Sequence, residues 1–349
     1  MNETRDRRNG GWAVRTLLRV SVALLLLAQS GAGGARAETS ELRMATQFGI
    51  GAMPMILMEK NRLLERRLAA AGLPDVKVTW RQFPGGNPMN EGLISGSLDI
   101  VSGGTTVFIT LWAKAKGSPQ AVRAVGAVSA LPLWFMTRDP DVKTLADLTA
   151  KHKIALTTVK VSVHAILLQM AAAKLYGPAE SGRFDALTIG LPHGDAATAL
   201  IAGGTEVNNH FSAPPFQYLE AKAPGVRRVT TAQDILGTPA TYMVAYATEK
   251  FRADNPRVYG AFVAALREAI DAINKDPRAA AKDYIEASKD PISVDDAVAM
   301  ITDPGAKFTM APDNVMTFAE FMFRQGLTKT RPAAWQDMFF PEAHGLPGS

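Results

Sequence analysis

Short apolar runs alternate along the chain with longer stretches in which apolar residues recur every three or four positions. Runs of the first kind are typical of strands, and stretches of the second kind are typical of helices. Their alternation predicts an α/β fold in which helices connect the strands of a sheet. The expected strands are residues 42–47, 76–80, 98–101, 122–128, 131–137, 153–157, 184–190, a strand from 206 onward, and 242–246.

The expected helices begin or end at residues that favour helix termini. Residues 54–71 place Leu57, Leu64 and Leu68 on one helical face and are followed by Gly72, a typical stop. The other expected helices are 162–175, 196–202, and, beyond residue 246, helices that start at Pro256, Pro277 and Ser293 and one over 312–324.

A weak internal repeat links two parts of this pattern. Residues 93–100 align with residues 200–207, which follow 107 positions later. One pair of matches is too few for a solenoid, so the repeat predicts two similar α/β lobes instead. The predicted first lobe comprises 38–130 and 240–349, the second comprises 131–239, and the chain crosses between them near 129–133 and 237–242.

The first 37 residues have the pattern of a secretory signal. An arginine-rich start is followed by an apolar run over residues 20–28 and by small residues that end in Ala35-Arg36-Ala37. Nine helical residues rise about 14 Å, whereas a membrane-spanning helix must cross about 30 Å. We therefore expect cleavage before Glu38 and a periplasmic product, exported by general secretion rather than by the twin-arginine route that Arg7-Arg8 would suggest.

Composition and charge narrow the class of protein. The chain has 349 residues, of which 47% are hydrophobic and 20% are charged, and it contains no cysteine. These values exclude a disordered chain, a disulfide scaffold, a thiolate zinc site and a lipid attachment site. The net charge of +5 would favour nucleic acid as a partner, but the first 37 residues contribute six basic and two acidic residues to it. The near-neutral remainder favours a small ligand.

The common sequence motifs of catalysis and metal binding are missing from the chain. It contains no G-x-S-x-G, no G-x-x-x-x-G-K-[ST] and no strand-to-helix G-x-G-x-x-G. No two histidines are spaced to form a ligand pair on one helix face, so we expect no metal site, and His164 is expected to be an ordinary packed or exposed helix residue. The histidines are His152, His164, His193, His210 and His344.

Six polar turns follow expected strands. In open α/β sheets, the loops beyond the carboxyl ends of the strands meet at the ligand crevice, so turns from two lobes would face each other across a cleft. The turns are residues 47–49, 84–87, 102–106, 157–162, 192–195 and 208–212.

Several segments together resemble the solute-binding proteins of ABC importers, in the nitrate, sulfonate, taurine and thiamine-precursor-like group. The resemblance covers about residues 41–273, and its motifs lie at residues 60–65, 89–100, 145–148, 153–156 and 194–203. The chain departs from the group at Asn61-Arg62, where glycine is common, and at Glu206, where aspartate is common. Both positions are structural. The group also includes a pyrimidine synthase with a cysteine-rich motif, which this cysteine-free chain does not have.

The resemblance implies a two-lobed periplasmic-binding-protein type II fold, with an α/β sheet and flanking helices in each lobe and a ligand cleft between the lobes. It implies a non-enzymatic, extracytoplasmic component without a cofactor, which captures a small anionic or heteroaromatic ligand and delivers it to an ABC permease and ATPase complex. We expect a monomer that binds no nucleic acid and is not inserted in a membrane. Two alternatives stay open: a sensory binding protein, and an enzyme with His193 or His210 as acid or base near Asp195.

The expected ligand contacts come from the polar turns of both lobes. Lys160 is the one cation among them and would neutralise a carboxylate or a sulfonate, and Tyr242 would stack on a flat ligand. The candidates are Gln47, Phe48, Asn87, Gly103 and Thr105 in the first lobe, Lys160, Ser162, His193, Asp195 and His210 in the second, and Tyr242 near the second crossing.

Overall fold

A computed structural model describes residues 37–349, and residues 39–349 form one compact unit. The expected export signal lies, apart from Ala37, outside the described residues. Within residues 37–349, no helix is both long enough and apolar enough to span a bilayer.

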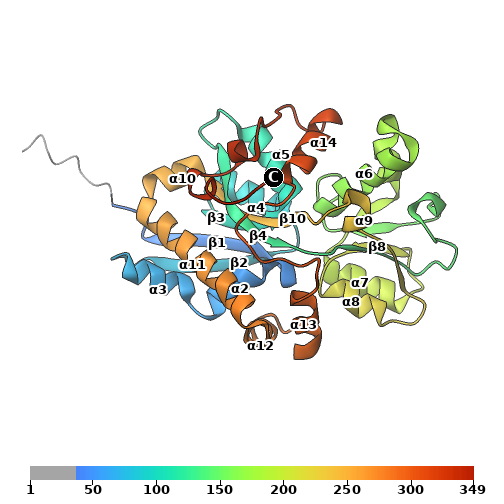
Figure 1. Ribbon diagram of the computed structural model, residues 1–349, viewed down its shortest axis with the longest axis horizontal. Coiled ribbons are helices and arrows are strands. Elements are labelled where there is room, and N and C mark those ends of the chain that lie inside the picture. The colour runs from blue at the N-terminus through green and yellow to red at the C-terminus, as the bar shows by residue number, and fades with distance from the viewer. Residues whose placement is uncertain (1–36) are drawn as a thin grey trace, which may run out of the picture. The chain divides into compact units, whose positions relative to one another are not determined.

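The first sheet, called sheet A here, has five strands in the order β2-β1-β3-β10-β4 (Figure 1). The strands β2, β1 and β3 are parallel to one another, and β10 lies antiparallel between β3 and β4. Their bounds are Glu41–Gln47 for β1, Lys77–Phe83 for β2, Ile100–Gly104 for β3, Val122–Ala130 for β4 and Thr241–Thr248 for β10.

The second sheet, sheet B, has the order β7-β6-β8-β5-β9. Again three parallel strands are followed in space by an antiparallel strand, here β5, which pairs with both β8 and β9. The bounds are Trp134–Thr137 for β5, Ile154–Leu156 for β6, Thr188–Gly190 for β7, Asn209–Ser212 for β8 and Arg227–Thr231 for β9.

The weak sequence repeat coincides with this likeness between the sheets. Helix α4 (Gly86–Ser95) leads into β3, and helix α7 (His193–Ala202) leads into β8, so each repeated segment joins a helix to the third parallel strand of a sheet. The chain passes from sheet A to sheet B after Ala130 and returns before Thr241. The prediction of two α/β sheets with flanking helices is therefore confirmed.

Helices cover the sheets and extend the chain beyond β10. The helices not yet mentioned are α2 Met53–Lys60, α3 Leu63–Ala70, α5 Thr105–Ala115, α6 Val163–Tyr176, α8 Phe216–Ala221, α9 Ala232–Leu236, α10 Glu249–Asp254, α11 Pro256–Lys275, α12 Pro277–Ser288, α13 Val294–Ile301 and α14 Val315–Arg324. Short 3₁₀ helices occur at Ile50–Ala52, Leu145–Asp147, Pro178–Leu187, Trp335–Met338 and Pro341–Ala343.

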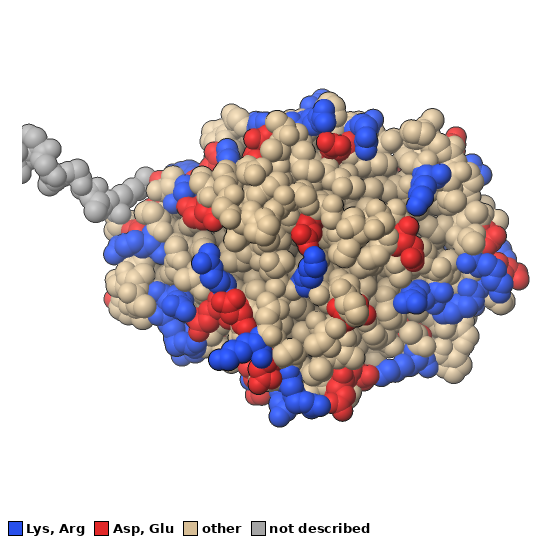
Figure 2. All heavy atoms as spheres, viewed as in Figure 1, with Lys and Arg blue, Asp and Glu red and all other residues tan. Residues whose placement is uncertain are grey.

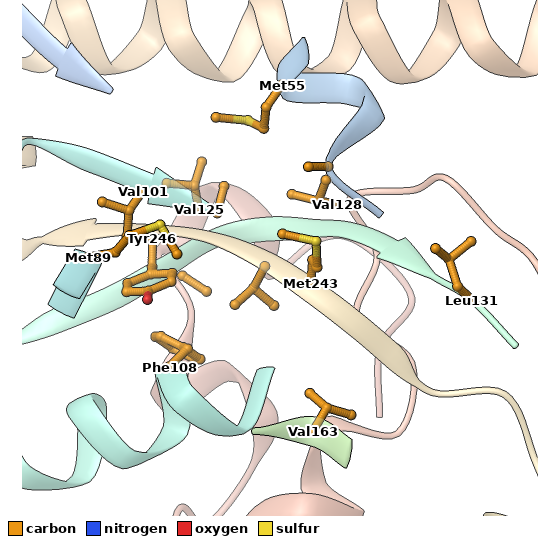
Figure 3. Close-up of a cluster of buried hydrophobic side chains, with 14 of the residues drawn as sticks. Met55, Met89, Val101, Phe108, Val125, Val128, Leu131, Val163, Met243 and Tyr246 are labelled. Carbon is orange, nitrogen blue, oxygen red and sulfur yellow. The ribbon is translucent and has the colours of Figure 1, made fainter. Parts of the chain in front are cut away.

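The core of sheet A packs on both faces of β4 and β10. Figure 3 shows Met55 on one side of these strands and Phe108 on the other. The rings of Phe108 and Tyr246 lie 5.2 Å apart, and the Tyr246 hydroxyl donates a hydrogen bond to Asn90 Oδ1 at 2.7 Å. Burying a large apolar side chain stabilises a fold by about 1.5–3 kcal/mol, so this cluster anchors the sheet from which half of the site is built.

Several predicted elements differ from the observed ones; for example, the strand expected over 131–137 begins at Trp134, and the helix expected over 196–202 begins at His193. The single helix expected over 54–71 is broken into α2 and α3, because Arg62 adopts the left-handed conformation (φ 49°), which stops an α-helix. The strand expected over 184–190 begins only at Thr188, since the preceding residues form a 3₁₀ helix that packs Phe184 against Tyr176. The strand expected from 206 onward begins at Asn209.

Candidate functional site

Two neighbouring cavities are lined by residues from the loops of both sheets. The larger has a volume of about 230 Å³, the smaller holds only about 10 Å³, and they share Gln47 and Tyr242. The larger is lined by Gln47, Phe48, Pro84, Pro192, His193, Gly194, Asp195, Phe216, Tyr242 and Asp290. The smaller is lined by Gln47, Gly86, Gly104, Val107, Thr157, Thr158, Ser162, Val163, His164 and Tyr242.

A wider groove of about 470 Å³ lies elsewhere, beside Trp80 on the edge strand β2. It is more open to solvent than the larger cavity, and long charged side chains such as Lys60 and Arg81 form much of its wall. Ligand sites are usually enclosed and apolar with a few converging polar groups. The pair of cavities between the sheets fits that description better.

The lining residues reach the cavities because they follow strand ends. Gln47 ends β1, and Phe48 follows it; His193 begins α7 shortly after β7 ends at Gly190. Phe216 begins α8 shortly after β8 and directly after the cis peptide between Pro214 and Pro215. The loops beyond the carboxyl ends of the parallel strands in both sheets thus meet at one place, as the sequence pattern predicts.

Behind the larger cavity, His193, His210 and Glu220 form a continuous hydrogen-bonded row, called the His–His–Glu array here. His193 Nδ1 lies 2.8 Å from His210 Nε2, and His210 Nδ1 lies 2.5 Å from Glu220 Oε1. His210 and Glu220 are fully buried, and Ser212 Oγ donates a further hydrogen bond to Glu220 Oε1 at 3.3 Å. His193 Nε2, at the cavity end, is buried without a partner among the described residues.

His164, at the start of α6, extends this group of imidazoles. Its ring lies edge-on to those of His193, at 4.8 Å, and Tyr242, at 5.6 Å. Neither of its ring nitrogens has a partner of good hydrogen-bond geometry among the described residues. Burial and the neighbouring His210 lower the pKa of His164 to about 3, against a smaller opposing effect of the Ser212 backbone. His164 is therefore neutral at physiological pH and offers one donor and one acceptor.

His193 is also neutral. Burial above all, and then the neighbouring His164 and His210, hold the pKa of His193 well below its ordinary value. Within residues 37–349, no three side chains of histidine, aspartate or glutamate are arranged to hold a metal ion.

Aromatic rings form the apolar part of the larger cavity. Phe216 stacks on His193 with ring centroids 5.8 Å apart and planes at 24°. Phe48 is 52% exposed, which is unusual for so large an apolar side chain, and lies at the cavity wall. Half-buried Tyr242 contributes to both cavities; its hydroxyl has no hydrogen-bond partner among the described residues, and burial raises its pKa. A ligand here can stack on rings and bond to Tyr242.

The charged side chains that line the cavities are carboxylic acids. Asp195 is exposed at the wall, and Asp290 accepts a hydrogen bond from Tyr284; burial raises the pKa of Asp290. None of the described residues that line the two cavities is lysine or arginine. On the outer face shown in Figure 2, by contrast, basic and acidic side chains are interspersed.

Contacts between the two sheets' loops enclose the cavities. The Ile50 amide donates to the Pro214 carbonyl at 3.2 Å, and Thr106 Oγ1 donates to the Val161 carbonyl at 2.6 Å. Gly49, next to Ile50, has φ 95°, and a Cβ there would lie 3.0 Å from the Pro214 carbonyl oxygen. Glycine therefore permits both the turn and the close approach to sheet B.

The structure places the eleven predicted site residues in three groups. Six line the cavities: Gln47, Phe48, Ser162, His193, Asp195 and Tyr242. Three lie behind the walls: Gly103 against Met89 and Tyr246, His210 in the His–His–Glu array, and Thr105, whose hydroxyl donates to the Thr241 carbonyl at 2.8 Å. Two are exposed, where Gly85 and Thr158 approach each other: Asn87 in the first turn of α4, and Lys160 on the loop before α6.

Four residues of this region were not predicted from the sequence. His164 follows the helix cap Ser162 by two positions, and Phe216 follows a Pro-Pro pair after a strand, so both had a local signal. Glu220 and Asp290 had no such local signal in the sequence. Glu220 reaches the site through the packing of α8, and Asp290 reaches it through the packing of the segment after α12.

No protein-family model matches the chain. A curated aliphatic sulfonates-binding protein of Escherichia coli (strain K12) is 29% identical over 212 residues, which are 56% of this chain and 62% of that relative. The chain thus matches less than two thirds of the relative's length.

Solved structures share the fold over most of the chain. The alkanesulfonate-binding protein SsuA from Xanthomonas axonopodis pv. citri, bound to MOPS, has a TM-score of 0.67 at 23% identity and covers 86% of this chain and 98% of its own. The periplasmic aliphatic sulphonate binding protein SsuA from Escherichia coli has a TM-score of 0.61 at 22% identity, with coverage of 87% and 92%. The periplasmic nitrate-binding protein NrtA from Synechocystis PCC 6803 has a TM-score of 0.64 at 15% identity, with coverage of 86% and 84%.

These comparisons confirm the expected periplasmic-binding-protein fold and the resemblance to sulfonate- and nitrate-binding proteins.

Proposed function

We propose that the chain is an extracytoplasmic solute-binding component of an ABC importer, which captures a small organic ligand between sheets A and B and delivers it to a permease and ATPase complex. The observation that carries the proposal is the partly open cavity of about 230 Å³, whose aromatic and polar walls come from the loops of both sheets. Cavities for drug-sized ligands measure about 300–1,000 Å³, so the ligand here is a small metabolite.

The proposed mechanism is closure of two lobes on the ligand, the first made of residues 38–130 and 240–349 and the second of 131–239. Each sheet contributes only part of the wall, so the full set of contacts forms only when the sheets approach. Contacts between the proposed lobes include Lys222 at the end of α8, which lies 2.8 Å from Asp296 on α13, and Tyr218, which donates a hydrogen bond to Asp303 at 3.3 Å. A closed, ligand-loaded protein presents a different surface to a permease from that of an open one.

Three features support the binding role and the exported location. The similar proteins described above are named as sulfonate- or nitrate-binding proteins, and two of them are described as periplasmic. The site offers rings and hydrogen-bonding groups of the kind that hold a ligand without reacting with it. The N-terminal sequence has the pattern of a cleavable signal.

The proposal is tested by ligand binding to the purified mature chain. Thermal-shift and calorimetric titrations with butanesulfonate, benzoate and 4-aminopyrimidine cover the expected ligand classes. A ligand present at about 100 times its dissociation constant adds about 2.7 kcal/mol to the free energy of unfolding. The bound compound should be recovered unchanged, whereas its conversion to a product would indicate an enzyme instead.

A pair of phenylalanine variants tests the location of the site. Phe216→Ala should weaken binding about tenfold, the loss of about 1.4 kcal/mol of ring contact. Phe323→Ala, on α14 and outside both cavities, should leave the affinity unchanged. Equal affinities for the two variants would move the ligand away from the larger cavity.

A further inference from the structure

We propose that His210 and Glu220 determine which hydrogen-bonding group His193 offers to a ligand, and that an anionic ligand is therefore bound together with one proton. The inference rests on the proposed binding function and adds to it a specificity mechanism and a ligand charge. In it, His193 is the contact residue, and His210 and Glu220, which do not line the cavities, act as positioning residues.

In the His–His–Glu array, the direction of one hydrogen bond determines the direction of the next, because each imidazole has one donor and one acceptor nitrogen when it is neutral. In the proposed row Glu220 is a carboxylate: its Oε1 accepts hydrogen bonds from His210 Nδ1 and Ser212 Oγ, and its buried Oε2 has no partner among the described residues. When His210 is neutral, its Nε2 carries a lone pair and accepts from His193 Nδ1. His193 Nε2 then also carries a lone pair, and that buried, unpartnered atom makes His193 an acceptor toward the ligand.

One added proton reverses this arrangement. The proton enters at His193 Nε2, and the proton of His193 Nδ1 passes to His210 Nε2, so that His210 becomes an imidazolium beside the Glu220 carboxylate. In the hydrogen bond between the two histidines, His210 Nε2–H is now the donor and His193 Nδ1 is the acceptor. His193 Nε2–H is then a donor toward the ligand. His193 stays neutral in both states, in agreement with its lowered pKa.

Among the described residues around the array, the charged groups are acidic, so positive charge comes from this added proton. Among the described residues, the titratable groups that line the cavities or touch the array are His164 on α6, Asp195 on α7, Glu220 on α8, Tyr242 on β10 and Asp290 after α12. His164 is neutral, and the remaining groups are acidic or neutral. A sulfonate or carboxylate in the larger cavity thus meets no lysine or arginine there, and the added proton turns His193 into a donor and cancels the negative charge of Glu220, which would otherwise repel the ligand.

The histidine states can be measured without a ligand. Long-range proton–nitrogen spectra of the ¹⁵N-histidine-labelled mature chain distinguish the two neutral tautomers from the charged ring. Between pH 5 and 9 we expect His193 and His210 to change in one common step, with His193 neutral throughout and its proton on Nδ1 at high pH and on Nε2 at low pH. A single His193 tautomer at all pH values, or separate midpoints for the two rings, would overturn the proposal.

Glu220→Gln removes the carboxylate that favours the charged state of His210. The common step should move to lower pH by about one unit or more, since an opposite charge in contact shifts a titration by that amount. The matched control is Glu206→Gln, the same change at an exposed carboxylate four positions before His210, which should leave the midpoint in place. An unchanged midpoint in Glu220→Gln would refute the positioning role. The wild-type spectra decide the question independently if this variant does not fold.

Calorimetry with butanesulfonate tests whether an anionic ligand is bound together with one proton. Above the midpoint of the step, titrations in two buffers of different ionisation enthalpy should show uptake of one proton per ligand, and the dissociation constant should rise about tenfold per pH unit. Binding without proton uptake would overturn this inference and leave the proposed binding function intact. Absence of binding by any of the three probe classes would instead overturn the proposed function, and with it the proton uptake.

Discussion

Sheets A and B share their strand order but fill corresponding positions with opposite kinds of residue. Helices α4 and α7 both have ten residues and start 107 positions apart, at Gly86 and at His193. The same spacing relates Gly103 on β3 to His210 on β8. Two glycines in the helix-and-strand unit of sheet A thus correspond to two hydrogen-bonded histidines in the unit of sheet B.

The space beside the glycines is used for apolar packing. A Cβ on Gly86 would lie 2.6 Å from Val107 Cγ1, and a Cβ on Gly103 would lie 3.0 Å from Met89 Cε. In sheet B the corresponding space holds imidazoles whose hydrogen bonds end at Glu220. One topology therefore supports a close-packed wall on one side of the cavities and a protonatable wall on the other.

The largest expected loss of stability comes from removing a buried aromatic side chain of sheet A. Phe108→Ala should lower the free energy of unfolding by about 3–5 kcal/mol, because it leaves a hole against Tyr246 and Phe339. Urea unfolding followed by circular dichroism measures the loss. Phe323→Ala, at a side chain that is 39% exposed, should cost about 1 kcal/mol or less, and equal losses would show that sheet A is not closely packed there.

A smaller effect is expected when a methyl group is added where sheet A has glycine. Gly86→Ala should lower the free energy of unfolding by about 1–3 kcal/mol, since Val107 is β-branched and cannot turn aside. Gly260→Ala, in α11 and with no atom within 4 Å of the added carbon, should raise it by about 0.5–1 kcal/mol. The same assay compares the two, and stabilisation by Gly86→Ala would contradict the close approach.

The effect expected to be smallest near neutral pH is the acid sensitivity of the imidazoles on the sheet B side, which grows only as the pH falls. Since the pKa of His164 is lowered to about 3 in the folded protein and is 6.5 in its reference state, the unfolded chain binds more protons between these values. Stability therefore falls as the pH drops from about 6.5 toward 3, by up to about 1.4 kcal/mol per pH unit for this residue.

His164→Leu should make that pH dependence less steep, as measured by urea unfolding at several pH values. His344→Leu, at an exposed histidine, is the control and should not change the slope. If His164→Leu retains the full slope, the acid sensitivity comes from other groups.

Much of the fold could be predicted from the sequence because its signals are local. Strand β1, the turn from β3 into α5 at Gly104-Thr105, and the cap of α6 at Ser162 all lie where apolar periodicity and capping residues place them. The break at Arg62 was not predicted. The apolar spacing continues across it, with Leu57 and Leu64 both buried, so the pattern gives no sign of a change in backbone conformation.

The site could be predicted only in part. Turns after strands predicted a shared crevice, and six of the predicted contact residues line the two cavities, since sheet topology alone brings such turns together. In the enzyme alternative, His193 or His210 acts near Asp195, but Asp195 is exposed, and His193 hydrogen-bonds to His210, seventeen positions away. That pairing depends on how α7 packs on β8, and the link to Glu220 depends on α8, so neither leaves a pattern along the chain.

The insertion of β10 between β3 and β4 sets an order for assembly. All the strands of sheet B lie between residues 134 and 231, so sheet B can form once that part of the chain has emerged. Sheet A needs Thr241–Thr248, and until these residues arrive the facing edges of β3 and β4 have no partner. The chain order thus allows sheet B to be completed before sheet A when the chain emerges from its N-terminus, and until Thr241–Thr248 follow, β3 and β4 present unpaired edges of the kind that favour aggregation.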